Sequence, residues 1–397
     1  MYKHRRIFTP ALNVPLVITV LSVCALLVLS QLYLAIPLIP VIREYFHISP
    51  IAATWIASTF GFAYAFGFLI FGPLCDRFGC KVLLVPGLAM LALITIAVGA
   101  SPSFDFLIKF RTLQGFLAAT FAPIALVYVS EVLPVSTRAT GIACVSTGFL
   151  LAGIVGQIYS SIVILTYGWR WIFWFLAIAY TVAAFIVAYR FPDSVTKKSA
   201  TSVLSVYKNM IFLLKSHRLL AAYTAAFMVL LSFVSMYSGL EPHLVSRYGI
   251  SQNNLLFIRM AGIPGMLLAP FTSSFIKRWG SKNVVLTGLV LASIGLALEA
   301  ISGQLLILVL SSGIFVAGIS AIMPSLIALV GSIATGASGS ALALYTFVLF
   351  IGASFGPLVT NLLNPIGFSG LCAILALFLL ITAFIININI QGTTQIG

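Results

Sequence analysis

Acidic residues are scarce in this sequence. Only seven of its 397 residues are Asp or Glu, and all charged residues together make up 7% of the chain. Hydrophobic residues make up 61%, and the mean hydropathy is +1.17. A soluble domain carries roughly a quarter of charged residues. The composition therefore excludes a soluble protein and predicts an integral membrane protein.

The residue patterns of enzymes and metal sites are also missing. Of the five cysteines, Cys24, Cys144 and Cys372 fall in apolar runs, while Cys75 and Cys80 fall in a short charged turn. This spacing predicts neither a disulfide framework nor a metal site. No H-E-x-x-H motif, phosphate-binding loop or nucleophile–base pair appears. We therefore expect no metal, no cofactor and no enzymatic activity.

Apolar runs of about twenty residues, the length that crosses a bilayer, recur along the whole chain. They predict an all-α membrane protein with twelve transmembrane helices. We place the helices near 14–36, 51–73, 82–100, 105–129, 139–163, 169–191, 219–241, 252–274, 283–302, 304–328, 339–361 and 366–389. Basic residues at positions 3–6 precede the first run, and no small-residue cleavage site follows them. The first span is thus expected to be an uncleaved anchor.

Basic residues predict which way the spans run. Twelve spans put both termini on one side, and that side carries fifteen of the 21 Lys and Arg residues, against four on the other side. Because positive charge collects in cytoplasmic loops, both termini are expected in the cytoplasm, and the lipid bilayer is the expected environment. Topology also accounts for the net charge of +14. We therefore expect no nucleic-acid partner.

The one long polar segment, 192–218, divides the chain. We expect an N-terminal six-helix bundle (1–191), a cytoplasmic linker (192–218) and a C-terminal six-helix bundle (219–397). The two halves repeat at an offset of 201 positions: Arg77, Gly79, Lys81, Gly87 and Pro123 return as Arg278, Gly280, Lys282, Gly288 and Pro324. Such repeats build transporters in which one site between two bundles faces either side in turn.

Residues 67–81, GFLIFGPLCDRFGCK, carry the most informative pattern. Gly67 and Gly72 remove side-chain bulk, so a second helix is expected to approach closely. Gly79 permits a turn. The pattern G-x4-G-P-x2-D-R-x-G-x-K resembles the signature loop between helices 2 and 3 of the major facilitator superfamily. The resemblance implies two pseudo-symmetric six-helix bundles and rocker-switch transport of a small molecule driven by an ion gradient.

Two further segments support the resemblance. Residues 131–141 (E-x2-P-x3-R-x2-G) resemble the family's matching cytoplasmic turn. The resemblance implies a cytoplasmic gate, an ion-pair network with two supporting glycines, built from Gly72, Asp76, Arg77, Gly79, Glu131 and Arg138. Residues 111–115 (R-x-x-Q-G) resemble the helix 4 motif, in which the Arg is associated with proton coupling or substrate contact. The alternative is a structural Arg111 bonded to helix-end carbonyls.

Charged groups inside the spans suggest where a substrate binds. An Arg at the centre of a membrane helix costs roughly 3 kcal/mol, so Arg111 and Arg259 are expected to face the interior. Aromatic residues, 13% of the chain, would line an adaptable cavity with them. The predicted substrate-binding residues are Gln31, Tyr64, Arg111, Gln114, Gln157, Phe233, Tyr237, Arg259 and Tyr345.

Proton coupling needs a carboxyl group that gains and loses a proton within the membrane, yet no acid lies in the central third of any span. The candidates are Asp105, Glu241 and Glu299, each near an outer span end. We prefer Asp105 and Glu241, together with Arg111, as the proton-coupling residues.

The resemblance is to the twelve-helix drug-exporter and sugar-efflux-like branches of the superfamily. It implies a monomeric exporter of small organic compounds, drug-like or metabolite, in a bacterial inner membrane, coupled to proton antiport. Two alternatives stay open at this point. One is an uptake carrier or facilitator for a polar or anionic nutrient, which two buried arginines would favour. The other is a sensor or scaffold that does not transport.

Overall fold

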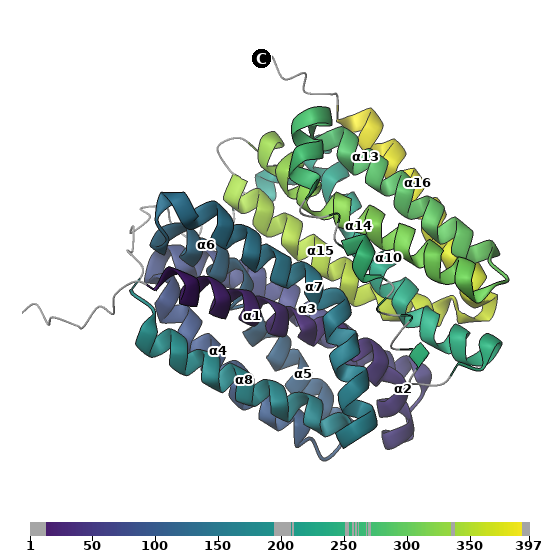
Figure 1. Ribbon diagram of the computed structural model, residues 1–397, viewed down its shortest axis with the longest axis horizontal. Helices are drawn as coiled ribbons and strands as arrows, with labels where there is room; N and C mark the ends of the chain where they lie inside the picture. Colours follow the sequence, from purple (N-terminus) through teal and green to yellow (C-terminus); the bar gives the residue numbers. More distant parts are fainter. Residues whose placement is uncertain are drawn as a thin grey trace, which may run out of the picture.

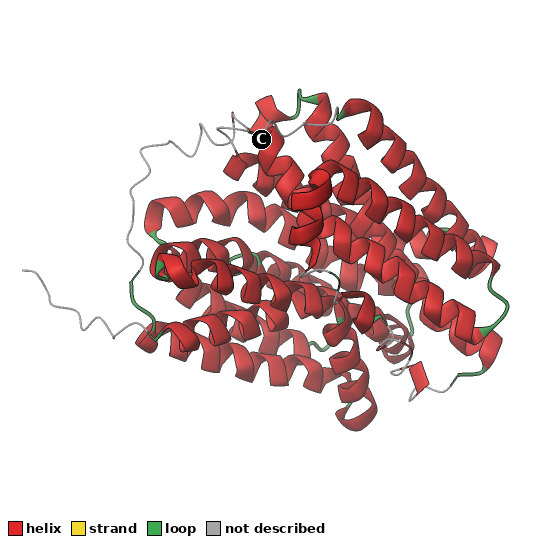
Figure 2. Cartoon of the chain, turned by 45° about the horizontal axis from the view of Figure 1, so that its top comes forward, coloured by secondary structure: helices red, strands yellow, loops and turns green. Residues whose placement is uncertain are grey.

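The computed structural model describes residues 13–193, 208, 210–250, 254–255, 258, 260, 262–266, 268, 271–334 and 338–390. Helices account for almost all of this part of the chain, and it contains no strand (Figure 2). The helices are α1 (Val14–Tyr33), α2 (Ala35–Phe46), α3 (Pro50–Phe78), α4 (Cys80–Gly99), α5 (Phe104–Ala118), α6 (Ala122–Val132), α7 (Val135–Tyr167), α8 (Trp169–Arg190), α10 (His217–Tyr248), α12 (Ile263–Met266), α13 (Thr272–Ile301), α14 (Leu305–Ile333), α15 (Ser338–Leu362) and α16 (Gly367–Asn389), with a 3-10 turn η2 at Asn364–Ile366.

Within the described residues, eleven segments are helical, long and apolar enough to cross a membrane. Their ends lie close to the predicted ones: the span predicted at 169–191 is observed at Trp169–Arg190, and that at 339–361 is Ser338–Leu362. The predicted span 252–274 lies partly outside the described residues, and its last three residues, 272–274, form the start of α13. A non-helical Gly280 (φ 77°) separates that start from the span predicted at 283–302.

The first span is broken at Leu34, between α1 and α2. Pro37 lacks a backbone N–H, so it cannot donate to the carbonyl of Tyr33 as a helix requires. Carbonyls at the break accept side-chain hydrogen bonds instead: Ser160 Oγ of α7 donates to Leu34 O at 2.9 Å, and Arg111 of α5 donates to Gln31 O at 2.9 Å. The broken backbone is thus satisfied by two neighbouring helices, as a membrane interior demands.

The helices form two groups, α1–α8 and α10–α16, which are coloured purple to teal and green to yellow in Figure 1. Between the groups, α3 packs along α15, α2 against α10, and α12 against α7. The boundaries predicted at 191 and 219 stay a prediction, because most of the segment between them lies outside the described residues.

The turn predicted from the repeat has the same geometry in both halves. Gly79 and Gly280 have positive φ (91° and 77°), a conformation that favours glycine. Two positions later, Lys81 Nζ donates to Phe191 O at 2.6 Å, after α8, and Lys282 Nζ donates to Asn387 O at 3.2 Å, near the end of α16. Lys81 also pairs with Asp193 at 3.1 Å. Each lysine therefore ties the start of one helix to the end of the last helix of its own half.

Close helix approach occurs at one of the two predicted glycines. A Cβ on Gly67 would collide with Ala119 Cβ and would lie 3.0 Å from Phe116 O. A Cβ on Gly72 would have nothing within 4 Å. The prediction of tight packing is therefore wrong at Gly72, where a side chain would enter space that no described atom fills.

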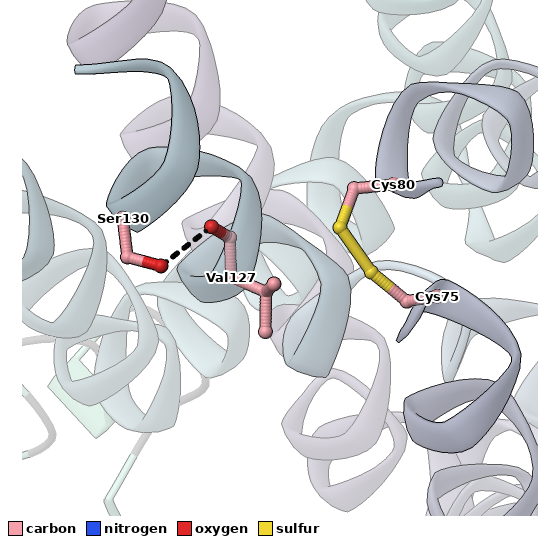
Figure 3. The surroundings of a disulfide bond; sticks show 4 residues. All are labelled: Cys75, Cys80, Val127 and Ser130. Atoms are coloured by element: carbon pink, nitrogen blue, oxygen red, sulfur yellow. Dashed lines mark hydrogen bonds between the residues drawn. A yellow bond between two sulfur atoms is a disulfide. The ribbon is translucent and has the colours of Figure 1, made fainter. Parts of the chain in front are cut away.

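The structure also corrects the interpretation of the cysteines. Cys75 at the end of α3 and Cys80 at the start of α4 form a disulfide, with Cα atoms 4.8 Å apart. Figure 3 shows the bond beside Val127 and Ser130 of α6. The predicted turn at Gly79 brings the two thiols together, but the sequence analysis drew no disulfide from it.

Candidate transport site

Arg111 is fully buried in the first group of helices and donates four hydrogen bonds. Its Nε donates to Ile56 O (3.2 Å), its Nη2 to Gln31 O (2.9 Å), and its Nη1 to Gln31 Oε1 (3.2 Å) and Gln114 Oε1 (2.7 Å). None of these acceptors carries a formal charge. The guanidinium is therefore stabilised by two backbone carbonyls and two side-chain amide oxygens, and its role in proton coupling or substrate contact stays a prediction.

The two glutamines that accept from Arg111, Gln31 and Gln114, donate hydrogen bonds to further residues. Gln114 Nε2 donates to Thr95 Oγ1 of α4 at 2.8 Å, and Gln31 Nε2 donates to the Tyr180 hydroxyl of α8 at 3.2 Å. That hydroxyl donates to Leu27 O at 2.9 Å. All these partners belong to α1–α8, so the hydrogen bonds of the predicted site residues Gln31, Arg111 and Gln114 join helices of one half.

Aromatic rings lead from Arg111 to the other half. Arg111 Cζ lies 4.3 Å from the centre of the Phe60 ring, a cation–π distance. Phe60 stacks on Tyr64 (centroids 5.7 Å apart, planes at 18°), and Tyr64 meets Phe350 of α15 edge-on at 4.7 Å. The guanidinium is thus two rings away from the contact between α3 and α15.

More rings join the halves beside α1. Tyr33, two residues after Gln31, meets Phe233 of α10 edge-on at 5.7 Å. Phe233 in turn contacts Tyr237 at 5.0 Å and Phe315 of α14 at 6.4 Å. We call the following buried rings the interface aromatic cluster: Tyr33, Tyr64, Phe233, Tyr237, Phe315 and Phe350. Three of its members, Tyr64, Phe233 and Tyr237, are predicted site residues.

Three buried polar atoms on the helices that carry these rings or pack against them have no hydrogen-bond partner among the described residues. They are the Tyr64 hydroxyl, Gln157 Oε1 and Ser232 Oγ. Gln157 Nε2 donates to Gly153 O at 2.7 Å, and a Cβ on Gly153 would lie 3.3 Å from Phe233 Cζ. Buried polar atoms are nearly always paired, so unpaired ones beside an aromatic cluster indicate a place where a ligand supplies the partner.

Of the remaining predicted site residues, Tyr345 and Arg259 are joined neither to Arg111 nor to the cluster by a described contact. The Tyr345 hydroxyl of α15 donates to Met323 Sδ of α14 at 4.0 Å, inside the second half. Arg259 lies outside the described residues.

Comparison with known proteins identifies the family. Residues 21–268, more than half of the chain, match the model of the Major Facilitator Superfamily. The chain belongs to this superfamily. The described residues follow its twelve-helix fold: the chain superposes on a bacterial homologue of the human lysosomal transporter Spinster, in an inward-facing and occupied conformation, with a TM-score of 0.71. That match has 15% identity and covers 94% of this chain and 96% of the other.

Relatives by sequence include transporters of bacteria and fungi. An uncharacterized transporter of Buchnera aphidicola subsp. Schizaphis graminum is 24% identical over 355 residues, 88% of this chain and 86% of the relative. The efflux pump radE of Floropilus chiversii is 29% identical over 174 residues, 43% of this chain and 32% of the pump. The protein is therefore a multi-pass membrane transporter rather than an enzyme.

The residues predicted to form the gate belong to the turn between α3 and α4 and to the turn between α6 and α7. Arg77 is exposed, with its Cζ 5.4 Å from the Phe78 ring, and Glu131 is exposed at the end of α6. Arg138 Nη2 donates to Leu133 O at 3.3 Å. The side chain of Asp76 lies outside the described part of the chain. The predicted ion-pair network stays a prediction.

The three candidate acids differ in burial. Asp105 is exposed in the first turn of α5, on the wall of a surface groove of about 560 Å³ that Lys109 also lines. Glu241 of α10 is 9% exposed. Glu299 of α13, which the sequence analysis set aside, is 1% exposed. Glu299, the candidate that was not preferred, is therefore the most deeply buried of the three acids.

Sequence reasoning missed Phe60 and Phe350, which connect Arg111 to the second half. Among 31 phenylalanines in the chain, neither had a distinguishing local pattern. For Phe60, the sequence contained one indication. Gly115, the last residue of the R-x-x-Q-G motif, packs against the backbone of Phe60, and a Cβ on Gly115 would collide with Phe60 O.

Proposed function

We propose that this transporter exports small, uncharged organic compounds with an aromatic or other apolar body, drug-like or metabolite, from the bacterial cytoplasm. It does so by alternating access and in exchange for protons. The observation that supports this proposal most directly is the interface aromatic cluster. Its rings come from α1 and α3 of one half and from α10, α14 and α15 of the other. A compound bound among them would contact both halves at once.

The chemistry of the cluster favours an apolar ligand with few polar groups. Each aromatic pair adds about 0.5–1.5 kcal/mol beyond its buried area, and a flat ligand inserted between the rings would gain similar contacts. The unpaired atoms of Tyr64, Gln157 and Ser232 would serve a small number of hydrogen bonds.

Charge argues against ionic substrates. An anion would need free donors, but the four hydrogen bonds of Arg111 end on acceptors of its own half. A cation in the cluster would be repelled by Arg111, whose Cζ lies 4.3 Å from the centre of the Phe60 ring that stacks on Tyr64. This reasoning favours an uncharged organic compound over the anionic nutrient of the uptake alternative.

The proposed direction of transport and the proposed membrane are based on the sequence and on the relatives. Fifteen basic residues on the side of the termini favour cytoplasmic termini in a bacterial inner membrane. The likeness to a fungal efflux pump supports export. We further propose that the halves, 1–191 and 219–397, rock about the cluster as a monomer, and that Gly72, Asp76, Arg77, Gly79, Glu131 and Arg138 close the cytoplasmic side.

Inside-out membrane vesicles test the proposal, since export then appears as uptake. Chloramphenicol is the uncharged aromatic probe, and tetraphenylphosphonium and benzoate are the cationic and anionic ones. With the vesicle interior made acidic, we expect accumulation of chloramphenicol above that of vesicles lacking the protein, and little of the two ions. Phe233→Ala should abolish accumulation, while Phe185→Ala, 60% exposed on α8, should retain it. Accumulation of benzoate alone would overturn the proposal.

A further inference from the structure

Glu299 is a buried acid, and none of the ion pairs or hydrogen bonds found among the described residues gives its carboxylate a cationic partner. It lies on α13, two residues before that helix ends at Ile301, and its side chain is buried to 1% exposure. Its Oε2 accepts one weak hydrogen bond, from Cys372 Sγ of α16 at 3.4 Å, and its Oε1 has no hydrogen-bond partner. A buried carboxylate normally has a cation or several donors.

In the described part of the chain, the helices that pack most extensively on α13 contain one other titratable group, Cys372. These neighbours are α14 and α16. Between Leu305 and Ile333, α14 has no charged or titratable residue, and between Gly367 and Asn389, α16 has only Cys372. Further titratable groups lie on α10, which packs on α16. Along the second half of α10 they are Tyr237, Glu241, His243, Arg247 and Tyr248.

An isolated negative charge in this place costs far more free energy than a neutral carboxylic acid. From this placement we propose that Glu299, paired with Cys372, is the proton-binding carboxyl of this transporter. The inference rests on the proposed exchange of substrate for protons and names the residue that carries the proton. It replaces Asp105, whose exposed carboxyl is already solvated.

The position of Glu299 suits uptake of a proton from the outer side. It lies within one helical turn of the end of α13, and the short connection 302–304 to α14 follows. In the proposed topology this connection faces the outside. A proton that enters there would reach Glu299 without crossing the bundle.

Packing connects Glu299 to the helix that carries Phe233 and Tyr237. The residue before Cys372, Leu371, packs against Gly239 of α10, where a Cβ would lie 2.8 Å from Leu371 Cδ2. Gly239 is two residues from Tyr237. When Glu299 changes charge, its contact with α16 changes, and α16 bears directly on α10 beside the interface aromatic cluster.

Infrared spectroscopy of the purified protein in detergent tests the proton site without any substrate. The carbonyl stretch of a protonated carboxylic acid should be present in the wild type near neutral pH and should disappear reversibly as the pH is raised. Glu299→Gln should lack this band. Asp105→Asn, the matched exposed control, should keep it. Cys372→Ala should keep the band to higher pH than the wild type, because the one donor to the ionised form is gone.

Two outcomes would overturn the assignment: identical spectra for the wild type and Glu299→Gln, or a band that persists at every pH at which the protein stays folded. Reconstituted vesicles then separate this failure from a failure of the proposed function. If the function is right, Glu299→Gln should still exchange labelled for unlabelled chloramphenicol but should lose at least tenfold in its accumulation driven by a pH gradient. If the wild type moves no chloramphenicol while the band titrates, only the proposed substrate and function are wrong.

Discussion

Arg111→Met tests whether Arg111 is an internal structural element or a substrate ligand. The wild-type side chain donates four hydrogen bonds, and a hydrogen bond between membrane helices is worth about 0.6 kcal/mol on average. The contact with Phe60 adds about 0.5–1 kcal/mol. Met fills much of the volume but donates nothing, so the free energy of unfolding should fall by about 3 kcal/mol. That is roughly a hundredfold in the unfolding equilibrium.

Unfolding by sodium dodecyl sulfate in mixed micelles, followed by tryptophan fluorescence, measures this loss. Arg111→Lys should lose about half as much, because its single nitrogen cannot reach all the acceptors that the guanidinium spans. The control is Arg43→Met, an exposed position on α2, which should stay within about 0.5 kcal/mol of the wild type. The reasoning fails if Arg111→Met is as stable as the wild type but binds chloramphenicol at least tenfold more weakly.

Three further predictions concern the glycine turns of the two halves, Gly72 of α3 and the disulfide. Gly79→Ala should lower the free energy of unfolding by about 1–3 kcal/mol, because φ is +91° there, and Gly280→Ala should do the same; equal stability in either would contradict the backbone argument. Gly72→Ala should cost less than about 0.5 kcal/mol in the same measurement, since open space surrounds it. Denatured protein should titrate three thiols before reduction and five after; five at the outset would exclude the disulfide.

Much of the fold could be predicted from the sequence, because local patterns determine it. The length of the apolar runs predicted the membrane spans. The glycine of the signature loop predicted the turn after α3, and the structure confirms this turn at Gly79. The break at Leu34 was not predicted. Its carbonyls are satisfied by Ser160 and by Arg111, residues 126 and 80 positions away in the sequence from the carbonyls they bond.

The candidate site was only partly predictable for the same physical reason. Burial cost alone indicated that Arg111 faces inward. Its partners, however, include the backbone carbonyls of Gln31 and Ile56. Every residue has a backbone carbonyl, so the sequence does not indicate which ones accept from Arg111. Likewise, Glu299 stands out only once α13 and α16 are packed together, because its one donor, Cys372, is 73 positions away.

The central claim is that the substrate binds between the two halves, among the rings of the interface aromatic cluster. Photoaffinity labelling with an azide derivative of chloramphenicol, followed by mass spectrometry of the labelled peptides, tests it most directly. The account predicts label on peptides of both halves, from α3 and from α10 or α15, that excess chloramphenicol removes and that Phe233→Ala reduces at least tenfold. Displaceable label confined to one half, and unchanged by Phe233→Ala, would contradict the account.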